Sequence, residues 1–266
     1  MFASKYHINI KRRYCVKEKY LSQSLLKEAG LISKLSSGVY IYMPIGLKLI
    51  NKIKNIIVEE MMKAGSIEIL MPIIQPSNIW KISGRFKNYG LEIFKFKDRR
   101  NNEFILQPTS EEVVTDLTYK EINSWKKLPK NFFHIQTKFR DEIRPRFGLV
   151  RCREFIMKDS YSFDTNKLSS LHSYKVMHDT YIRIFNRIGL KFFSVPANNG
   201  VIGGLYSHEF QSTSNSGENL VLYEPSKEKY INIDLFKTYS LLKFRLIKKK
   251  NKKKNIYFKY SNIKTF

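Results

Sequence analysis

The sequence predicts an α+β fold in which helices flank a mainly antiparallel sheet. Two stretches, residues 47–64 and 168–188, repeat apolar residues with helical spacing. Two aromatic, β-rich runs lie on either side of a Pro–Gly segment around residues 145–148, which is typical of an antiparallel hairpin. Strand and helix patterns do not alternate regularly, which disfavours a parallel α/β sheet. With 42% hydrophobic residues, the chain of 266 residues can bury a core.

The first long helix is predicted over residues 47–64. Its apolar stripe includes Leu49, Ile53 and Ile56, and Gly65 ends it. The run IEILMPII follows as a predicted strand that closes on Pro72. Proline cannot donate to a strand ladder, so it suits a strand end or a sheet edge.

The middle of the chain carries a strand, a loop and a helix, followed by the hairpin. FILQPTSEEVVTDL predicts the first three, with Glu111 and Glu112 in the first helical turn, where acids complement the helix dipole. NFFHIQTKF and VRCREFIMKDSYSF predict the two arms of the hairpin. His134 lies on the first arm without ligand spacing, so we expect it in the core or on the surface.

The last third predicts a helix over residues 168–188 and then two strands, KFFSVPA and LYSHEFQST, separated by Gly203–Gly204. After Tyr223 the pattern weakens. From residue 243 to the end there are ten Lys or Arg and no acid. Blocks of like charge usually stay solvated, so we expect residues 224–266 to be a poorly ordered tail, with RNA binding by the tail as the alternative.

The net charge of +25 favours a polyanion as partner, such as RNA or nucleotide phosphates. A competing explanation is an AT-rich genome, because Lys, Asn, Ile, Phe and Tyr are all abundant. The two cysteines form no metal or disulfide framework, which fits a reducing cytosol. No apolar run approaches the ~20 residues of a membrane span. The basic opening segment lacks the apolar stretch of a secretory signal, while an organellar transit role stays open. We therefore expect a cytoplasmic protein.

FRDEIRPRFGLVRCREF, residues 139–155, concentrates five arginines. Arginine forms planar, bidentate contacts with phosphate and carboxylate. If Arg140 and Arg151 lie on facing strands, they converge on one triphosphate. Glu142 then shares the face of Arg140 and can accept from a base amine, and Phe155 offers a surface for stacking. The alternative is a surface hairpin with solvated arginines.

Several segments in order resemble prolyl-tRNA synthetases, class II aminoacyl-tRNA synthetases of the bacterial type. The resemblance runs from SLLKEAGLISKLSSGVYIYMPIG to about Tyr223. The helix–strand–Pro segment ending at Pro72 resembles motif 1, a dimer-interface element, and FRDEIRPRFG with RCREF resembles motif 2, the ATP hairpin. MKDSYSF and GGLYSHEF resemble segments specific to the prolyl enzymes. The resemblance implies a class II catalytic domain, here partial, over residues 1–223.

The resemblance also implies roles for individual residues. Arg140 is similar to the motif 2 arginine that binds the α-phosphate and the amino acid's carboxylate, and it is the expected catalytic residue. The implied ATP-binding residues are Arg140, Glu142, Arg151 and Phe155, with Glu142 on the adenine amine and Phe155 under the adenine ring.

For proline, the resemblance implies that Thr109 and Glu111 grip the secondary ammonium. An ammonium with two N–H donors suits one hydroxyl and one carboxylate. The alternative makes Thr109 a helix N-cap and Glu111 a dipole partner. Phe163 and His208 are implied in lining the proline pocket, and a purely structural role for His208 stays open.

The implied activity is that of a proline–tRNA ligase. Proline's carboxylate attacks ATP while Arg140 and Mg²⁺ neutralise phosphoryl charge, and the prolyl-adenylate then passes proline to tRNA(Pro). The sequence departs from the family because no glycine follows Gly217 and the only later arginine is Arg245, so motif 3 is not found. An editing insertion and an anticodon-binding domain are not found either, so the fold is expected to be incomplete at its C-terminal end.

Three explanations for these departures stay open. A second polypeptide supplies motif 3, the gene is truncated, or a trimmed protein keeps residual function. A different class of function also stays open, namely a non-catalytic class II-like protein that dimerises and binds tRNA. In either case the resemblance implies a homodimer through motif 1.

Overall fold

The residues that the computed structural model describes are 5–8, 10, 21–146, 148–197, 206–214, 217, 219–224, 229–232 and 259–265. The chain divides into two compact units, residues 1–184 and 185–266. The division at residue 223 that the sequence suggests rests on resemblance and composition, and it stays a prediction. Within the described residues, no helix combines the length and apolar character needed to cross a membrane.

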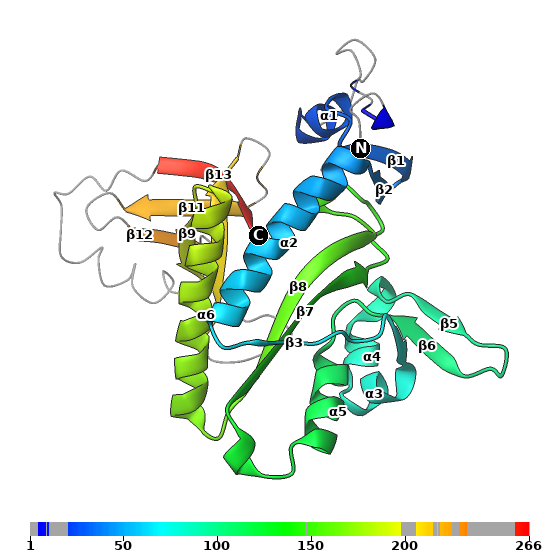
Figure 1. Cartoon of the computed structure of the whole chain (residues 1–266), viewed down its shortest axis with the longest axis vertical. Coiled ribbons are helices and arrows are strands. Elements are labelled where there is room, and N and C mark those ends of the chain that lie inside the picture. Colours follow the sequence, from blue (N-terminus) through cyan, green and yellow to red (C-terminus); the bar gives the residue numbers. More distant parts are fainter. Residues whose placement is uncertain are drawn as a thin grey trace, which may run out of the picture. The chain divides into compact units, whose positions relative to one another are not determined.

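The first unit mixes helices with short sheets (Figure 1). Its elements in chain order are α1 (Leu21–Glu28), β1 (Ile32–Ser36), β2 (Val39–Tyr42), α2 (Pro44–Lys63), β3 (Ile67–Glu68), β4 (Ile74–Pro76), α3 (Ser77–Ile82), α4 (Arg85–Asn88), η3 (Gly90–Glu92), β5 (Lys95–Lys97), β6 (Glu103–Leu106), α5 (Glu111–Glu121), η4 (Trp125–Lys127), β7 (Lys130–Phe139), η5 (Gly148–Val150), β8 (Glu154–Phe163) and α6 (Lys167–Ile188). Helix α6 continues past residue 184, the last residue of this unit.

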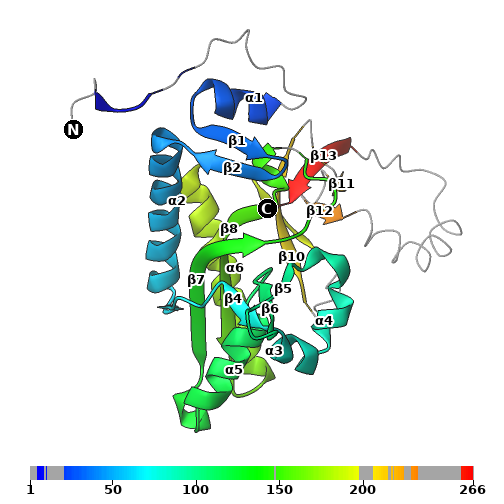
Figure 2. The same ribbon diagram turned by 90° about the vertical axis from the view of Figure 1, so that its right-hand side faces the viewer.

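The centre of this unit is the β7–β8 hairpin, which confirms the antiparallel pair predicted from the two aromatic runs. Pairing is continuous over ten residues of each strand, from Lys130 opposite Phe163 to Phe139 opposite Glu154. Helix α2 runs along one side of this pair, and α3, α4 and α5 gather with β5 and β6 on the other (Figures 1 and 2). The predicted helices at residues 47–64 and 168–188 are confirmed as α2 and α6.

The strand predicted from the run IEILMPII to close on Pro72 is only two residues long, because this run passes between two sheets. Its first two residues form β3, which pairs in parallel with β7 at Phe132 and Phe133. The chain leaves that ladder before Pro72, which has no N–H to donate. It re-enters pairing as β4, antiparallel to β6 in the separate β4–β6–β5 sheet. Between the two strands, Met71 is buried.

The loop after β6 links the two sheets. The Gln107 carbonyl accepts from the Phe139 amide at 2.9 Å, and the Gln107 side chain donates to the Thr137 carbonyl at 2.9 Å. Trp80 of α3, Ile105 of β6 and Ile93 form a hydrophobic core cluster in this part of the unit. The loop that enters α5 is therefore held against β7 from its first residue.

The second unit is one antiparallel sheet of five strands in the order β12-β11-β13-β10-β9. The strands are β9 (Phe193–Pro196), β10 (His208–Thr213), β11 (Asn219–Glu224), β12 (Lys229–Asn232) and β13 (Lys259–Thr265). Buried Val195 and Val221 pack together with Phe193 and Tyr230 against them. All pairings described in both units are antiparallel except β3–β7, which confirms the mainly antiparallel α+β fold.

Two expectations fall wholly or partly outside the described residues. The Gly203–Gly204 link is one of them. Of the tail at residues 224–266, the structure describes Glu224, β12 and β13, and the remainder lies outside the described residues. The poor order expected for the tail therefore stays a prediction.

Candidate functional site

The segment Thr109–Glu111 joins β6 to helix α5. The helix begins at Glu111, with Glu111 and Glu112 in its first turn as the sequence predicts. Its N-cap is Ser110, which makes no side-chain cap, so the alternative that Thr109 caps this helix is wrong. The Thr109 hydroxyl instead donates to the Glu111 carboxylate. The structure thus brings together the two side chains expected to hold proline's ammonium.

Arg85, at the start of α4, holds both acids of this turn. Its Nη1 lies 3.2 Å from a Glu111 carboxylate oxygen and 3.1 Å from a Glu112 oxygen. Burial lowers the pKa of the Arg85 guanidinium, but the charges of Glu111 and Glu112 outweigh this and raise the net pKa. For Glu112, burial dominates over Arg85 and raises the carboxyl pKa. A cavity of about 470 Å³ opens beside this cluster, with Arg85 and Glu111 among its lining residues.

The second candidate region is the connection between β7 and β8, and here the expected placement of the arginines is corrected. Neither Arg140 nor Arg151 lies on the paired strands, which end at Phe139 and begin at Glu154. The Arg140 amide donates to the Arg153 carbonyl at 2.9 Å, and Arg151 forms a bridge with Arg146. The connection loops out because Pro145 lacks an amide hydrogen and Gly148 takes a positive φ of 62°.

The shape of this connection depends on a close approach to the β1–β2 turn. Gly38 has a φ of +77°, and a Cβ there would lie 2.9 Å from the side chain of Pro145. The Gly38 carbonyl accepts from the Arg153 amide at 2.9 Å. Inside the connection, the Cys152 thiol donates to the Gly148 carbonyl, and burial raises its pKa to about 11. This cysteine is a packed residue and not a reactive thiolate.

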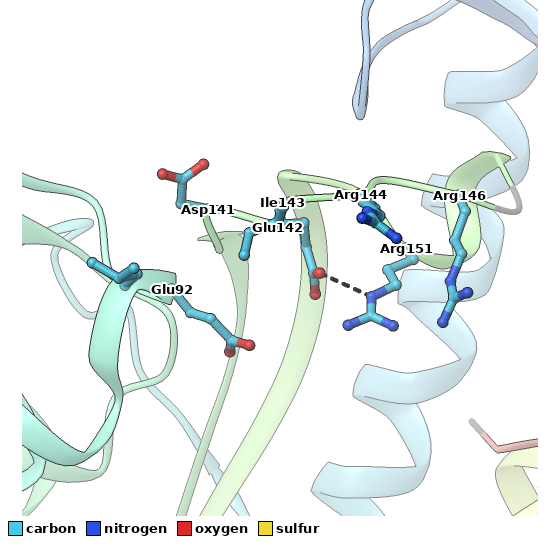
Figure 3. Close-up of a pocket in the computed structure, with 8 residues that line it drawn as sticks. Glu92, Asp141, Glu142, Ile143, Arg144, Arg146 and Arg151 are labelled. Carbon is cyan, nitrogen blue, oxygen red and sulfur yellow. Dashed lines mark hydrogen bonds and ion pairs between the residues drawn. The ribbon is translucent and has the colours of Figure 1, made fainter.

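Glu142 and Arg151 meet in an ion pair, with 2.9 Å between the arginine Nε and the carboxylate (Figure 3). The expectation that Glu142 shares a strand face with Arg140 is wrong, because its amide donates back to the Arg140 carbonyl at 2.8 Å in a tight turn. The pair lines a cavity of about 390 Å³, whose charged lining residues are Glu92, Asp141, Glu142, Arg144, Arg146 and Arg151. Figure 3 shows the arginines gathered on one side, Glu92 and Asp141 on the other, and Glu142 between them. Three acids thus offset three arginines.

Arg140 is not among the residues that line this cavity. Its guanidinium carbon lies 5.4 Å from the centre of the Phe155 ring, in a cation–π contact. Its Nε is buried and has no hydrogen-bond partner among the described residues. Buried polar groups are nearly always hydrogen-bonded, so this N–H group is available to donate to an acceptor, such as a ligand oxygen.

Two further predicted residues lie elsewhere. Phe163, at the end of β8, packs against Phe132 and lines a different cavity from Glu111, with Leu128 and Ile122. His208 begins β10 in the second unit, opposite Pro196 of β9. Placement of Phe163 and His208 in a proline pocket stays a prediction.

The sequence reasoning missed a buried polar cluster that lies under the Thr109–Glu111 segment. Its members are Gln107, Ser110, His134, Lys138, Asp159 and Tyr161. A signal was present, since His134 and Lys138 lie on one face of β7, and Asp159 and Tyr161 on one face of β8. His134 lies opposite Asp159 in the register, which the predicted hairpin had not specified. His134 is fully buried, as one of its two expected placements required.

Comparison with protein families matches residues 94–261 to the tRNA synthetase class II core domain (G, H, P, S and T). Among curated proteins, the proline–tRNA ligase of Bordetella pertussis is 51% identical over 245 residues, which is 92% of this chain. The proline–tRNA ligase of Burkholderia mallei is 48% identical over the same share. The chain spans only 42% of the length of each of these relatives.

Solved structures show the same fold at low sequence identity. The prolyl-tRNA synthetase of Giardia lamblia, in complex with prolyl-adenylate, has a TM-score of 0.67 at 20% identity and covers 79% of this chain and 48% of its own. The prolyl-tRNA synthetase of Cryptosporidium parvum, with L-proline and AMP, has a TM-score of 0.63 at 15% identity and covers 71% and 40%. At these identities the likenesses show the fold alone.

Proposed function

We propose that this chain, which belongs to the class II tRNA synthetase core family, activates L-proline with ATP and takes part in its transfer to tRNA(Pro). The observation that carries the proposal is the 51% identity to a curated proline–tRNA ligase over 92% of the chain. Two features of the first unit support it, namely the Glu111 carboxylate beside Thr109 and the arginine-rich β7–β8 connection.

In this proposal, the Thr109 hydroxyl and the Glu111 carboxylate receive the two N–H groups of proline's ammonium. Arg85 pairs with the Glu111 carboxylate at 3.2 Å and helps to fix its position. Phe163 and His208 remain candidates for the walls of the pocket. A charge-assisted contact of this kind contributes about 1.5–3 kcal/mol.

ATP binds at the β7–β8 connection, with Arg140 as the catalytic residue. Arg140 uses its unpaired Nε and the rest of its guanidinium to hold the α-phosphate and proline's carboxylate. It neutralises charge as the carboxylate attacks the α-phosphorus, the bond to the β-phosphate breaks and pyrophosphate leaves. Arg151 meets the triphosphate after Glu142 releases it. Phe155 stacks under adenine, and Glu142 accepts from the adenine amine.

Mg²⁺ accompanies the triphosphate in this proposal. The described residues hold no group of three His, Cys, Asp or Glu side chains that converge as a metal site. Mg²⁺ usually keeps several waters and binds through substrate phosphates and one or two carboxylates. Asp141, which lines the cavity, has suitable hard oxygen donors, and the ion would supply charge neutralisation when bound.

The partners in this proposal are L-proline, tRNA(Pro) and a second copy of the chain that docks through the region of α2 to β4. A second polypeptide that supplies a motif 3 arginine belongs to the proposal too, as does a cytoplasmic location. The alternative of a non-catalytic, dimerising tRNA-binding protein differs from it in one measurable property, namely the formation of prolyl-adenylate.

Proline-dependent exchange of pyrophosphate into ATP tests the proposed activity directly. We expect exchange by the wild-type chain, and a rate at least about a thousandfold lower for Arg140→Ala, the scale of loss seen when an arginine that stabilises phosphoryl charge is removed. The matched control is Arg99→Ala, because Arg99 is exposed on the turn after β5 and lies outside the site.

The outcomes separate the two functions. Absence of exchange by the wild-type chain, both alone and with the second polypeptide that supplies motif 3, together with salt-sensitive tRNA binding, favours the non-catalytic protein. Exchange that persists unchanged in Arg140→Ala contradicts the role of Arg140 while leaving the activity itself established.

A further inference from the structure

The buried polar cluster under the Thr109–Glu111 segment has no role in the chemistry described above. Lys138, on β7, is fully buried, which is rare for a lysine. Taking a charge out of water costs several kcal/mol per ion in real proteins. If this position of β7 contributed only to core packing, an apolar side chain would be more stable there than Lys138. The buried charge of Lys138 therefore needs another explanation.

The hydrogen bonds of Lys138 connect the hairpin to the Thr109–Glu111 segment and to the loop before it. Its Nζ lies 2.8 Å from the Ser110 hydroxyl oxygen, 3.1 Å from Gln107 Oε1 and 3.0 Å from the Asp159 carboxylate. The His134 Nε2 atom is also 2.8 Å away. An ammonium has three N–H groups, so the three oxygen acceptors on Ser110, Gln107 and Asp159 are enough to use all of its donors. Lys138 thereby ties β8 to the middle residue of Thr109–Ser110–Glu111.

Tyr161, on β8, holds the backbone of the same segment. Its hydroxyl accepts from the Ser110 amide at 3.0 Å, lies 3.4 Å from the Thr109 hydroxyl and donates to Asp159. Burial, together with the charge of Glu111 and the bond to Asp159, raises the pKa of Tyr161, so the hydroxyl keeps its proton. Ser110 is therefore held at its amide by Tyr161 and at its side chain by Lys138.

The Asp159 carboxylate accepts hydrogen bonds from both Lys138 and Tyr161. Burial by itself raises the pKa of its carboxyl, but hydrogen bonds from His134 and Tyr161 and the charge of Lys138 outweigh this, so the net pKa is lowered. Burial likewise lowers the pKa of Lys138, and the charge of Asp159 opposes this only in part. A charged Asp159 therefore fixes the direction of the Tyr161 hydroxyl proton and leaves the oxygen lone pairs for Ser110.

We propose that Tyr161, oriented by Asp159 and Lys138, is a positioning residue that holds Thr109 and Glu111 in the geometry that grips proline. It acts through the Ser110 amide and the Thr109 hydroxyl, and it sets the affinity for the imino acid but not for ATP. This inference rests on the proposed function, because it assigns the ligand that Thr109 and Glu111 hold.

The test compares Tyr161→Phe with Tyr181→Phe in the full chain. Both remove one hydroxyl with a side-chain hydrogen-bond partner, but Tyr181, on α6, pairs with Lys158 and makes no described contact with the segment. Proline and a non-hydrolysable ATP analogue are titrated separately, and hydrogen–deuterium exchange is followed over residues 107–112. Asp159→Asn, which keeps the size of the side chain, is a second test of the same expectation.

We expect Tyr161→Phe to weaken proline binding about tenfold, the effect of one lost hydrogen bond in a buried site, and to leave binding of the ATP analogue within about twofold. Exchange at residues 107–112 should accelerate in Tyr161→Phe and stay unchanged in Tyr181→Phe. Equal proline affinity and equal exchange in the two variants overturn the proposal.

Failure of the proposed function gives a different result. If the wild-type chain binds no proline, that function falls, and the exchange at residues 107–112 alone decides the positioning role. Acceleration confined to Tyr161→Phe and Asp159→Asn then still supports it, and its absence overturns it.

Discussion

The Thr109–Glu111 segment and the β7–β8 connection both present charged side chains, but the two regions hold those charges differently. Under Thr109–Glu111, Ser110, His134 and Lys138 are fully buried and share hydrogen bonds with Asp159 or with one another. In the connection, the Arg151 side chain is 40% exposed and its partner Glu142 is 14% exposed. The first region is built before a ligand arrives, whereas the second satisfies its charges with exchangeable pairs.

This difference matches the chemistry of the two proposed ligands. A small imino acid offers few atoms, so its affinity depends on groups that are already in place. A triphosphate carries much charge and can replace the carboxylates that occupy the arginines beforehand. The ion pair of Glu142 with Arg151 balances one positive charge of the connection, and we expect it to compete with the proposed triphosphate.

The largest expected effect concerns the stability that the buried ion pair of Lys138 with Asp159 contributes under the Thr109–Glu111 segment. Lys138→Met leaves Asp159 buried without its cation, so we expect the free energy of unfolding to fall by about 3–5 kcal/mol. Lys120→Met is the control, since Lys120 is exposed and pairs with Asp116 on the same helix. That exposed pair contributes at most about 0.5 kcal/mol. Urea unfolding of both variants measures the difference, and equal losses contradict the distinction.

A smaller effect separates ligand recognition from stability at the prebuilt segment. Glu111→Gln keeps the shape of the side chain but removes the charge that faces the ammonium, so the KM for proline should rise by about ten- to a hundredfold. The KM for ATP should stay unchanged. Asp116→Asn is the matched control, because it removes a negative charge from the same helix and the same cavity lining. A comparable rise in both variants points to a general electrostatic effect and removes the specific role of Glu111.

The smallest effect concerns the exchangeable side. Glu142→Gln keeps an oxygen acceptor for the adenine amine but frees Arg151, so the KM for ATP should fall by about two- to fivefold, the worth of one exposed ion pair. Unfolding should shift little. Glu92→Gln removes a charge from the same cavity without breaking a described ion pair, and it should change the KM less. An effect of Glu92→Gln as large as that of Glu142→Gln shows that net charge, and not the pair, governs ATP affinity.

Secondary structure followed the sequence pattern wherever a local rule was enough. Helical spacing located α2 and α6, and the aromatic runs located β7 and β8. The rule failed at residues 67–74, where a continuous apolar run serves two sheets in succession. The rule failed again at Glu142, which was expected on the same strand face as Arg140 but lies in a turn.

The sequence by itself determined the class of fold, the family resemblance and the identities of the residues with ligand chemistry. These depend on periodicity and residue type, which are local properties of the chain. Only the tertiary structure decided which partner each charge takes. Arg85 reaches Glu111 across 26 positions of sequence, Lys138 reaches Ser110 across 28, and Arg151 pairs with Glu142. Hydrogen bonds and desolvation act through space, and their partners are known only once the strands and helices have packed.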